Sequence, residues 1–257
     1  MNINLKPSAH IFGGIGEIFP DLRMLWIHKQ DIKFVGRENF AGLQNLEWLE
    51  LKKNKIEFLA EDVFWDLTSL KFLELSENKL YEIQEMTFNR PINLENLFLS
   101  NNYIKELYFN IFSNLIKLKK LSFSENQISK LDRDIFRNLT NLEALSFAGN
   151  QIRKLDEKLF WSLTNLNDLF FSKNQIEELH ENIFCKLKKL QKVSFDENKI
   201  ELLSRNLLLN NLEVSEIWIH GNPLKTIDID FSKLPNVKLY NVSDEYYYFK
   251  SSLFRQN

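Results

Sequence analysis

Asparagines recur along most of this chain at one constant interval, which is the step from position 54 to position 78. The interval does not slip by a single position across the series. A fixed period of this length indicates a repeat architecture, in which each unit packs mainly against its neighbours. We therefore expect a stack of similar coils rather than a globular domain around one central core. The repeated residues are Asn54, Asn78, Asn102, Asn126, Asn150, Asn174, Asn198 and Asn222.

Apolar residues follow the same period. Leu49 and Leu51 precede Asn54, and apolar residues hold both positions in every later repeat. Inward apolar residues that alternate with variable outward ones predict one short strand per repeat, stacked about 4.8 Å apart in a parallel sheet. The inward asparagine has the donors and the acceptor to satisfy backbone groups where the chain leaves the strand, so we expect a ladder of amides. A phenylalanine column from Phe40 to Phe184 is expected to fill the outer side of the coils.

The repeat reads LxxLxLxxNxIxxLxxxxFxxL, and residues 46–67 match every fixed position. This pattern resembles the typical 24-residue class of the leucine-rich-repeat family over roughly residues 22–224. The resemblance implies an α/β-type leucine-rich-repeat solenoid, or horseshoe, of about nine coils. Its parallel β-sheet would lie on the concave face, with mostly loops and short helical turns on the convex face.

Three segments follow from the phase of the repeat. Residues 1–21 are expected to be a partial, truncated N-terminal repeat, because Met1 and Ile3 are in phase with Leu25 and Ile27. Residues 22–221 hold about eight full repeats and a ninth strand, and residues 222–257 form a C-terminal cap without cysteines. Secreted relatives have cysteine-bearing caps, so we expect that an amino-terminal cap and a signal peptide have been lost here. The C-terminal cap is expected to pack through Ile227, Ile229, Leu234, Val237, Leu239 and the cluster Tyr246, Tyr247, Tyr248 and Phe249.

Charge and cysteine content exclude several classes of partner and site. The 33 basic and 35 acidic residues give a formal charge of -2, without the basic surface that nucleic acid or an anionic membrane requires. No stretch is apolar enough for direct membrane insertion. Cys185 is the single cysteine, so neither an intramolecular disulfide nor a zinc site with several cysteines is expected.

Histidines give no sign of a catalytic or metal site. His28 and His220 share one outward position but lie eight repeats apart, which at about 4.8 Å per strand is roughly 38 Å. His10 and His180 fall elsewhere, so we expect no metal, no cofactor and no catalytic residues. Cys185 has lysines nearby that could activate a thiol, but a small residue beside the core is the favoured interpretation.

The outward strand positions suggest where a ligand binds. Aromatic residues gather in the first four repeats and again in the last ones, and small residues separate the two groups. Contiguous exposed aromatic residues are typical of interaction sites, although stacking that steadies the first coils would also explain them. The predicted ligand-binding residues are Trp26, Trp48, Glu50, Phe72, Glu74, Phe98, Phe170 and Trp218.

Together these features predict a non-enzymatic domain that binds a protein ligand on its concave face. The resemblance to Toll-like and Slit-like ectodomains implies a secreted or cell-surface protein, and Asn138 and Asn241 match the glycosylation acceptor pattern. One alternative is a structural or self-associating matrix module. A second is an intracellular scaffold or regulatory subunit in the cytoplasm, which the missing cystines and signal peptide favour. The ligand and the oligomeric state stay open.

Overall fold

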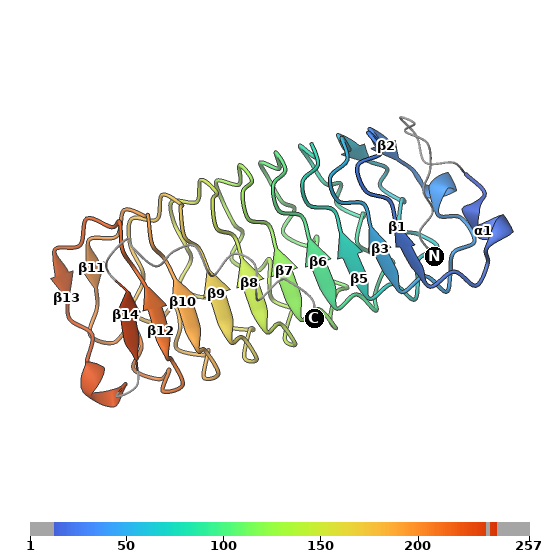
Figure 1. Ribbon diagram of the computed structural model, residues 1–257. Coiled ribbons are helices and arrows are strands. Elements are labelled where there is room, and N and C mark those ends of the chain that lie inside the picture. Colours follow the sequence, from blue (N-terminus) through green and yellow to red (C-terminus); the bar gives the residue numbers. More distant parts are fainter. Residues whose placement is uncertain (1–12, 235–236, 241–257) are drawn as a thin grey trace.

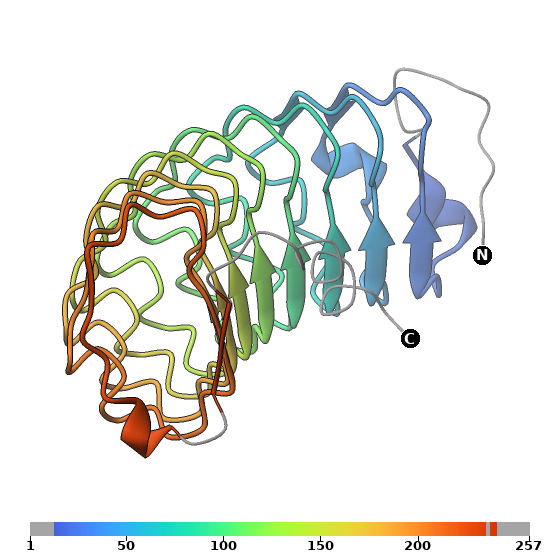
Figure 2. The same cartoon turned by 60° about the vertical axis from the view of Figure 1, so that its left-hand side comes forward.

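The computed structural model describes residues 13–234 and 237–240. In this part of the chain, about nine turns stack into a curved solenoid that contains little helix. Each turn contributes a three-residue strand to the inner curve and returns through turns on the outer side (Figures 1 and 2). The solenoid predicted from the constant repeat period is confirmed.

The strands of the inner curve form one sheet. Over the described residues it has ten parallel strands in chain order, and Leu49 pairs with Leu73 in the in-register pattern that a constant repeat length dictates. β14 extends the sheet beyond the nine repeat strands, so the C-terminal cap continues the stack. The strands are β1 (Met24–Trp26), β3 (Trp48–Glu50), β5 (Phe72–Glu74), β6 (Asn96–Phe98), β7 (Lys120–Ser122), β8 (Ala144–Ser146), β9 (Asp168–Phe170), β10 (Lys192–Ser194), β12 (Glu216–Trp218) and β14 (Lys238–Tyr240).

A few short elements lie outside this sheet. Two-residue strands pair near each end, β2 (Phe34–Val35) with β4 (Phe58–Leu59) and β11 (Leu202–Leu203) with β13 (Thr226–Ile227). Single 3-10 turns span Arg37–Asn39 and Phe231–Lys233, and the helical turn α1 spans Ile15–Ile18. None of the described helices has the length and apolar character needed to cross a bilayer.

The segment before residue 22 contributes the turn α1 to the stack. Gly16 packs so closely against the next coil that a Cβ there would lie 2.2 Å from the carbonyl oxygen of Ala41. The expected strand residues Met1 and Ile3 lie outside the described residues, as do Tyr246, Tyr247, Tyr248 and Phe249 of the expected cap.

The asparagines form a hydrogen-bonded ladder that joins the coils. The Nδ2 of Asn126 donates to the carbonyl oxygens of Phe123 in its own coil, at 3.0 Å, and Leu99 in the preceding coil, at 2.9 Å. Its Oδ1 accepts from the N–H of Ile104, at 3.0 Å. The same three kinds of bond recur from Asn78 to Asn222. The ladder therefore satisfies backbone groups that the bend would otherwise bury without partners.

The residue before each ladder asparagine makes the turn off the strand. It has a positive φ throughout the stack, for example 60° at Lys53 and 55° at Glu125, and two repeats use glycine there, Gly149 and Gly221. Glycine adopts this left-handed conformation without the steric cost that a side chain adds. The position in the repeat thus sets the turn conformation, and glycine removes its steric cost in two coils.

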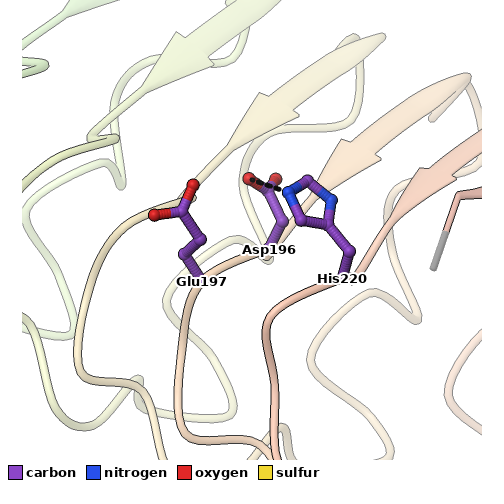
Figure 3. Close-up of side chains that lie close together, drawn as sticks. All are labelled: Asp196, Glu197 and His220. Atoms are coloured by element: carbon purple, nitrogen blue, oxygen red, sulfur yellow. Dashed lines mark ion pairs between the residues drawn. The ribbon is translucent and has the colours of Figure 1, made fainter. Parts of the chain in front are cut away.

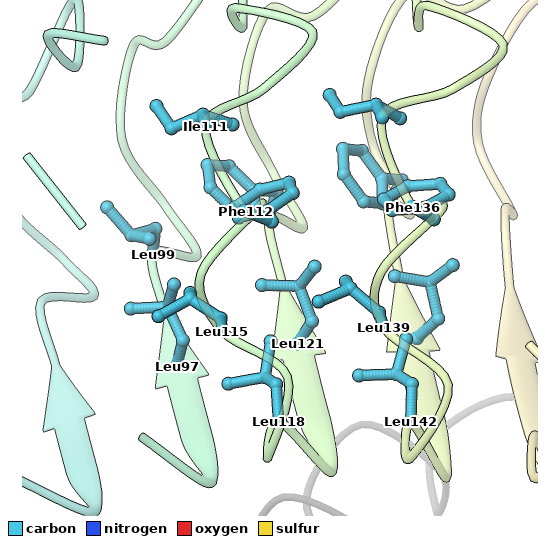
Figure 4. Packing of buried hydrophobic residues seen from close by; sticks show 14 of the residues in the cluster. Leu97, Leu99, Ile111, Phe112, Leu115, Leu118, Leu121, Phe136, Leu139 and Leu142 are labelled. Carbon is cyan, nitrogen blue, oxygen red and sulfur yellow. The ribbon is translucent and has the colours of Figure 1, made fainter. Parts of the chain in front are cut away.

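The interior is a continuous apolar core. Ile111, Phe112, Leu115, Leu118 and Leu121 show how one coil fills it (Figure 4). Rings of the phenylalanine column stack from coil to coil, with centroids 6.1–6.4 Å apart. Each such ring stabilises the fold by roughly 1.5 to 3 kcal/mol through burial.

The C-terminal cap packs largely, but not wholly, through the expected residues. Ile229 and Leu234 are buried, and Val237 and Leu239 pack partly buried against the core. The expectation for Ile227 is wrong, because its side chain is exposed. Ile227 belongs to the two-residue edge strand β13, which no further coil covers within the described residues.

Candidate functional site

Three columns of outward side chains line the inner face of the sheet. They begin at Met24, Trp26 and His28 and continue at steps of one repeat, because the strands pair in register. Neighbouring members of a column lie about one strand spacing, 4.8 Å, apart. Side chains from successive repeats therefore contact one another across this face.

An aromatic strip of Trp26, Trp48, Phe72 and Phe98 covers the strands β1, β3, β5 and β6. The rings of Trp48 and Phe72 stack with centroids 3.7 Å apart and planes 12° from parallel. Phe98 tilts against Phe72 at 5.4 Å. Trp26 and Trp48 are half-buried, and Met24 beside them is 44% exposed. The accessible apolar surface is therefore concentrated at the N-terminal end of the sheet.

The other aromatic residues predicted to bind a ligand are buried, so the expectation that they are exposed is wrong. Phe72 is 6% and Phe98 is 5% exposed, and Phe170 and Trp218 are also buried. One strand spacing is close to the contact distance between stacked side chains, so each ring covers its neighbour. Sequence periodicity shows that these residues point outward, but it does not show this lateral cover.

Both predicted acidic residues make contacts inside the sheet. Glu50 Oε1 accepts hydrogen bonds from the indole N–H groups of Trp26, at 3.1 Å, and Trp48, at 2.6 Å, and its Oε2 lies 2.9 Å from His28 Nε2. Glu74 accepts from the backbone N–H of Ser76 at 2.8 Å, and burial raises the pKa of Glu74. Glu50 thus fixes the orientation of the two accessible indoles.

Small residues form the middle of the face, as the sequence indicates. The hydroxyl of Ser122 bonds to Ser100 at 2.8 Å and to Ser124 at 3.2 Å, and Ser124 bonds to Ser146 at 2.6 Å. This row of serines is a polar floor whose hydroxyls are already engaged with one another. The aromatic strip therefore does not continue through the centre of the sheet.

The C-terminal half of the face combines charge with a second aromatic group. Trp218 stacks on Tyr240 of the cap strand β14, with centroids 5.1 Å apart and planes 6° from parallel. Burial raises the pKa of Asp168 to about 6, against the opposing effect of Lys192. The repeat pattern missed Tyr240, because this residue follows Trp218 two positions sooner than a full repeat would place it.

One cluster of titratable side chains was not foreseen. Asp196, Glu197 and His220 meet where the chain leaves β10 and β12 (Figure 3). His220 Nε2 lies 3.7 Å from Asp196 Oδ2, although we expected no histidine to have a partner suited to metal binding. The signal was present, since Asp196 and His220 occupy adjacent steps of the column that begins at His28.

The arrangement around His220 does not prepare a serine nucleophile. The hydroxyls of Ser172 and Ser194 donate to Asp196 Oδ1 instead of to the imidazole. A histidine that activates serine must accept the hydroxyl proton itself.

Cys185 is a half-buried free thiol on the outer side.

Other residues noted in the sequence lie on the outer side or at loop edges. His180 Nε2 lies 3.4 Å from Glu157, and Trp65 packs under the guanidinium of Arg90 at 4.4 Å. The acceptor Asn138 is half-buried and its Nδ2 donates to the carbonyl oxygen of Ser113 at 2.8 Å. The second acceptor, Asn241, lies outside the described residues.

Comparison with protein families agrees with this geometry. The family model described as "Leucine rich repeat" matches residues 20–80, 92–152 and 140–200, which is most of the chain. The chain belongs to the leucine-rich-repeat family. Comparison with curated proteins gives no significant match.

Solved leucine-rich-repeat structures share the fold. The TLR13–ssRNA13 complex matches with a TM-score of 0.76 and 22% identity, over 90% of this chain and 41% of that one. The Leptospira interrogans protein LIC12759 matches with a TM-score of 0.76 and 26% identity, over 86% and 55%. The Toll–Spatzle complex from Drosophila matches with a TM-score of 0.76 and 18% identity, over 94% and 37%. The chain thus spans less than two thirds of each of these solved chains.

Proposed function

We propose that this leucine-rich-repeat chain is a non-enzymatic domain that binds a protein ligand at the N-terminal half of its concave face. The observation that carries the proposal is the accessible group of Met24, Trp26 and Trp48, oriented by Glu50. Tryptophan is enriched among the residues that dominate binding energy, and ordered rings lose little entropy when a ligand binds. Phe72 stacks on Trp48, and Phe98 packs against Phe72, so these two buried rings support the accessible indoles from one side.

A protein is the ligand class that this surface favours. Toll is solved in complex with Spatzle on the same fold, whereas TLR13 is solved with single-stranded RNA. Nucleic acid binding relies on neutralising phosphates with lysine and arginine. The strip here presents Glu50 and Glu74 beside its rings, and the chain carries a formal charge of -2. Both features favour a protein over RNA.

We further propose a secreted or cell-surface location. The likeness of this repeat class to Toll-like ectodomains and the acceptor sequence at Asn138 support it. Mass spectrometry of the chain expressed in animal cells with a secretion signal should find carbohydrate on Asn138. An unmodified Asn138 in a fully secreted product would remove that support.

The binding proposal is tested with paired double variants. Trp26→Ala with Trp48→Ala removes the concave indoles, and Trp65→Ala with Trp161→Ala removes two convex indoles, both exposed, as a matched control. Each chain is immobilised and exposed to secreted material, and circular dichroism verifies that both variants fold. The concave variant should lose its specific partner while the convex variant keeps it. Equal capture by all three chains would contradict the proposal, as would capture of nothing but a second copy of the chain.

A further inference from the structure

We propose that Asp196, Glu197 and His220 form a binding site for a divalent transition-metal ion, with zinc as the best match. One ligand atom from each residue lies within 4.8 Å of the other two. Figure 3 shows the three side chains close together on two adjacent coils, with Asp196 and His220 facing each other. This proposal is independent of the protein ligand, because the cluster follows β10 and β12 whereas the aromatic strip lies on β1, β3, β5 and β6.

Asp196 supplies the strongest argument. Its side chain is fully buried at 0% exposure, and its Oδ1 already accepts from the hydroxyls of Ser172 and Ser194. Its Oδ2 is also buried and accepts no hydrogen bond from any described residue. A buried carboxylate oxygen without a hydrogen bond is costly, and Oδ2 has one ion-pair contact among the described residues, with His220 Nε2 at 3.7 Å. A cation in front of Oδ2 would remove that cost.

The spacing between Asp196 and His220 fits a shared ion. At 3.7 Å, Oδ2 and Nε2 are too far apart for a direct hydrogen bond, which needs about 2.7 to 3.2 Å. Two ligand atoms bonded at about 2.1 Å to a tetrahedral zinc ion lie about 3.4 Å apart. A shift of a few tenths of an ångström would therefore bring both atoms into zinc coordination.

Glu197 supplies the third side chain. Its backbone takes the left-handed turn conformation, with φ of 52°, and its side chain extends over Gly221 of the next coil. A Cβ at Gly221 would lie 3.1 Å from Glu197 Cγ, so glycine leaves the room that this carboxylate uses. The carboxylate is 45% exposed and lies 3.6 Å from Lys173 Nζ, from which it must turn to reach the ion.

The donor set selects among metals. One imidazole with two carboxylates suits zinc and its neighbours, whereas calcium and magnesium prefer oxygen ligands alone. Three protein ligands leave the fourth tetrahedral position to a water molecule or another ligand. Within the described residues, no other adjacent pair of the His28 column combines a histidine with a carboxylate.

Zinc titration of the full chain tests the site. The chain is purified without a histidine tag, stripped with a chelator and titrated with zinc chloride or magnesium chloride near neutral pH in a calorimeter. We expect one zinc ion per chain and no binding of magnesium at the same concentration. Glu197→Gln and His220→Gln should each weaken zinc binding at least tenfold. Glu197→Gln alters a partly exposed side chain, so it keeps the test valid if His220→Gln fails to fold.

His180→Gln is the matched control, because His180 lies beside one carboxylate, that of Glu157, and is not part of the cluster. It should leave the zinc affinity unchanged. X-ray absorption at the zinc edge should show only nitrogen and oxygen ligands, at about 2.0 to 2.2 Å. A sulfur ligand at about 2.3 Å would assign the ion to Cys185 and overturn the proposal. Failure to bind zinc, or equal binding by Glu197→Gln, would overturn it as well.

Discussion

Replacing Asn126 with alanine is expected to lower the free energy of unfolding by about 4 kcal/mol. The substitution removes three short hydrogen bonds, two donated to the carbonyl oxygens of Leu99 and Phe123 and one accepted from Ile104. It also removes a longer contact from Nδ2 to the carbonyl oxygen of Ser124, at 3.3 Å. The carbonyls keep one partner each, because Leu99 also accepts from Asn102 and Phe123 also accepts from Asn150. The N–H of Ile104 loses its acceptor and is left buried.

The magnitude follows from these unequal losses. An orphaned buried donor costs about 1 to 3 kcal/mol, and each further lost hydrogen bond costs about 0.5 to 1.5 kcal/mol. The sum is about 2 to 6 kcal/mol, centred near 4 kcal/mol. Asn141→Ala is the control, because this exposed side chain donates one bond, to the carbonyl oxygen of Ile116, and should cost less than about 1 kcal/mol.

Equilibrium unfolding in urea, followed by tryptophan fluorescence, measures both variants. The last step of the ladder gives a third comparison, since Asn222 makes the same three bonds but is only partly buried. Asn222→Ala should therefore cost less than Asn126→Ala. Equal losses of unfolding free energy for Asn126→Ala and Asn141→Ala would refute the reasoning that the ladder amides satisfy buried backbone groups of neighbouring coils.

Two further predictions concern charge and core packing. Burial raises the pKa of Asp168 from 3.8 to about 6, so the folded chain holds this proton more tightly than the unfolded chain and loses stability as the pH rises through that interval. Asp168→Asn should therefore stabilise the chain by about 1 to 2 kcal/mol at pH 7, after allowance for partial exposure, and by almost nothing near pH 3.5. A stabilisation independent of pH would contradict this cause. Phe136→Ala should lower the free energy of unfolding, measured in urea, by about 3 to 5 kcal/mol, because the fully buried ring contacts Phe112 and Phe160. A loss below about 1 kcal/mol would show that the coils do not share one core.

The repeat period was sufficient to predict most of the fold. A constant repeat length places Leu49 beside Leu73 and every ladder asparagine beside the next, so the sheet and its register follow directly. The tenth strand was not predicted, because Tyr240 comes two positions too early after Trp218 and falls out of phase. Departures from strict periodicity at a cap depend on packing against the last coil, which the repeat pattern does not encode.

The candidate site was only partly predictable. Periodicity gives the direction of Trp48 and Phe72, but their exposure depends on how closely stacked rings cover each other. The cluster at His220 was missed because histidines were compared only with one another, across the length of the stack. Asp196 one step earlier in the same column was the informative neighbour, and its Oδ1 accepts hydrogen bonds from Ser172 and Ser194.

Hydroxyl-radical footprinting of the chain with and without its captured partner tests the binding face most directly. The tryptophans are natural probes, since Trp26 and Trp48 lie on the concave side and Trp65 and Trp161 on the convex side. Partner binding should lower the oxidation of Met24, Trp26 and Trp48 and leave the convex pair unchanged. Protection of the convex pair with unaltered oxidation of the concave residues would contradict recognition by the inner face.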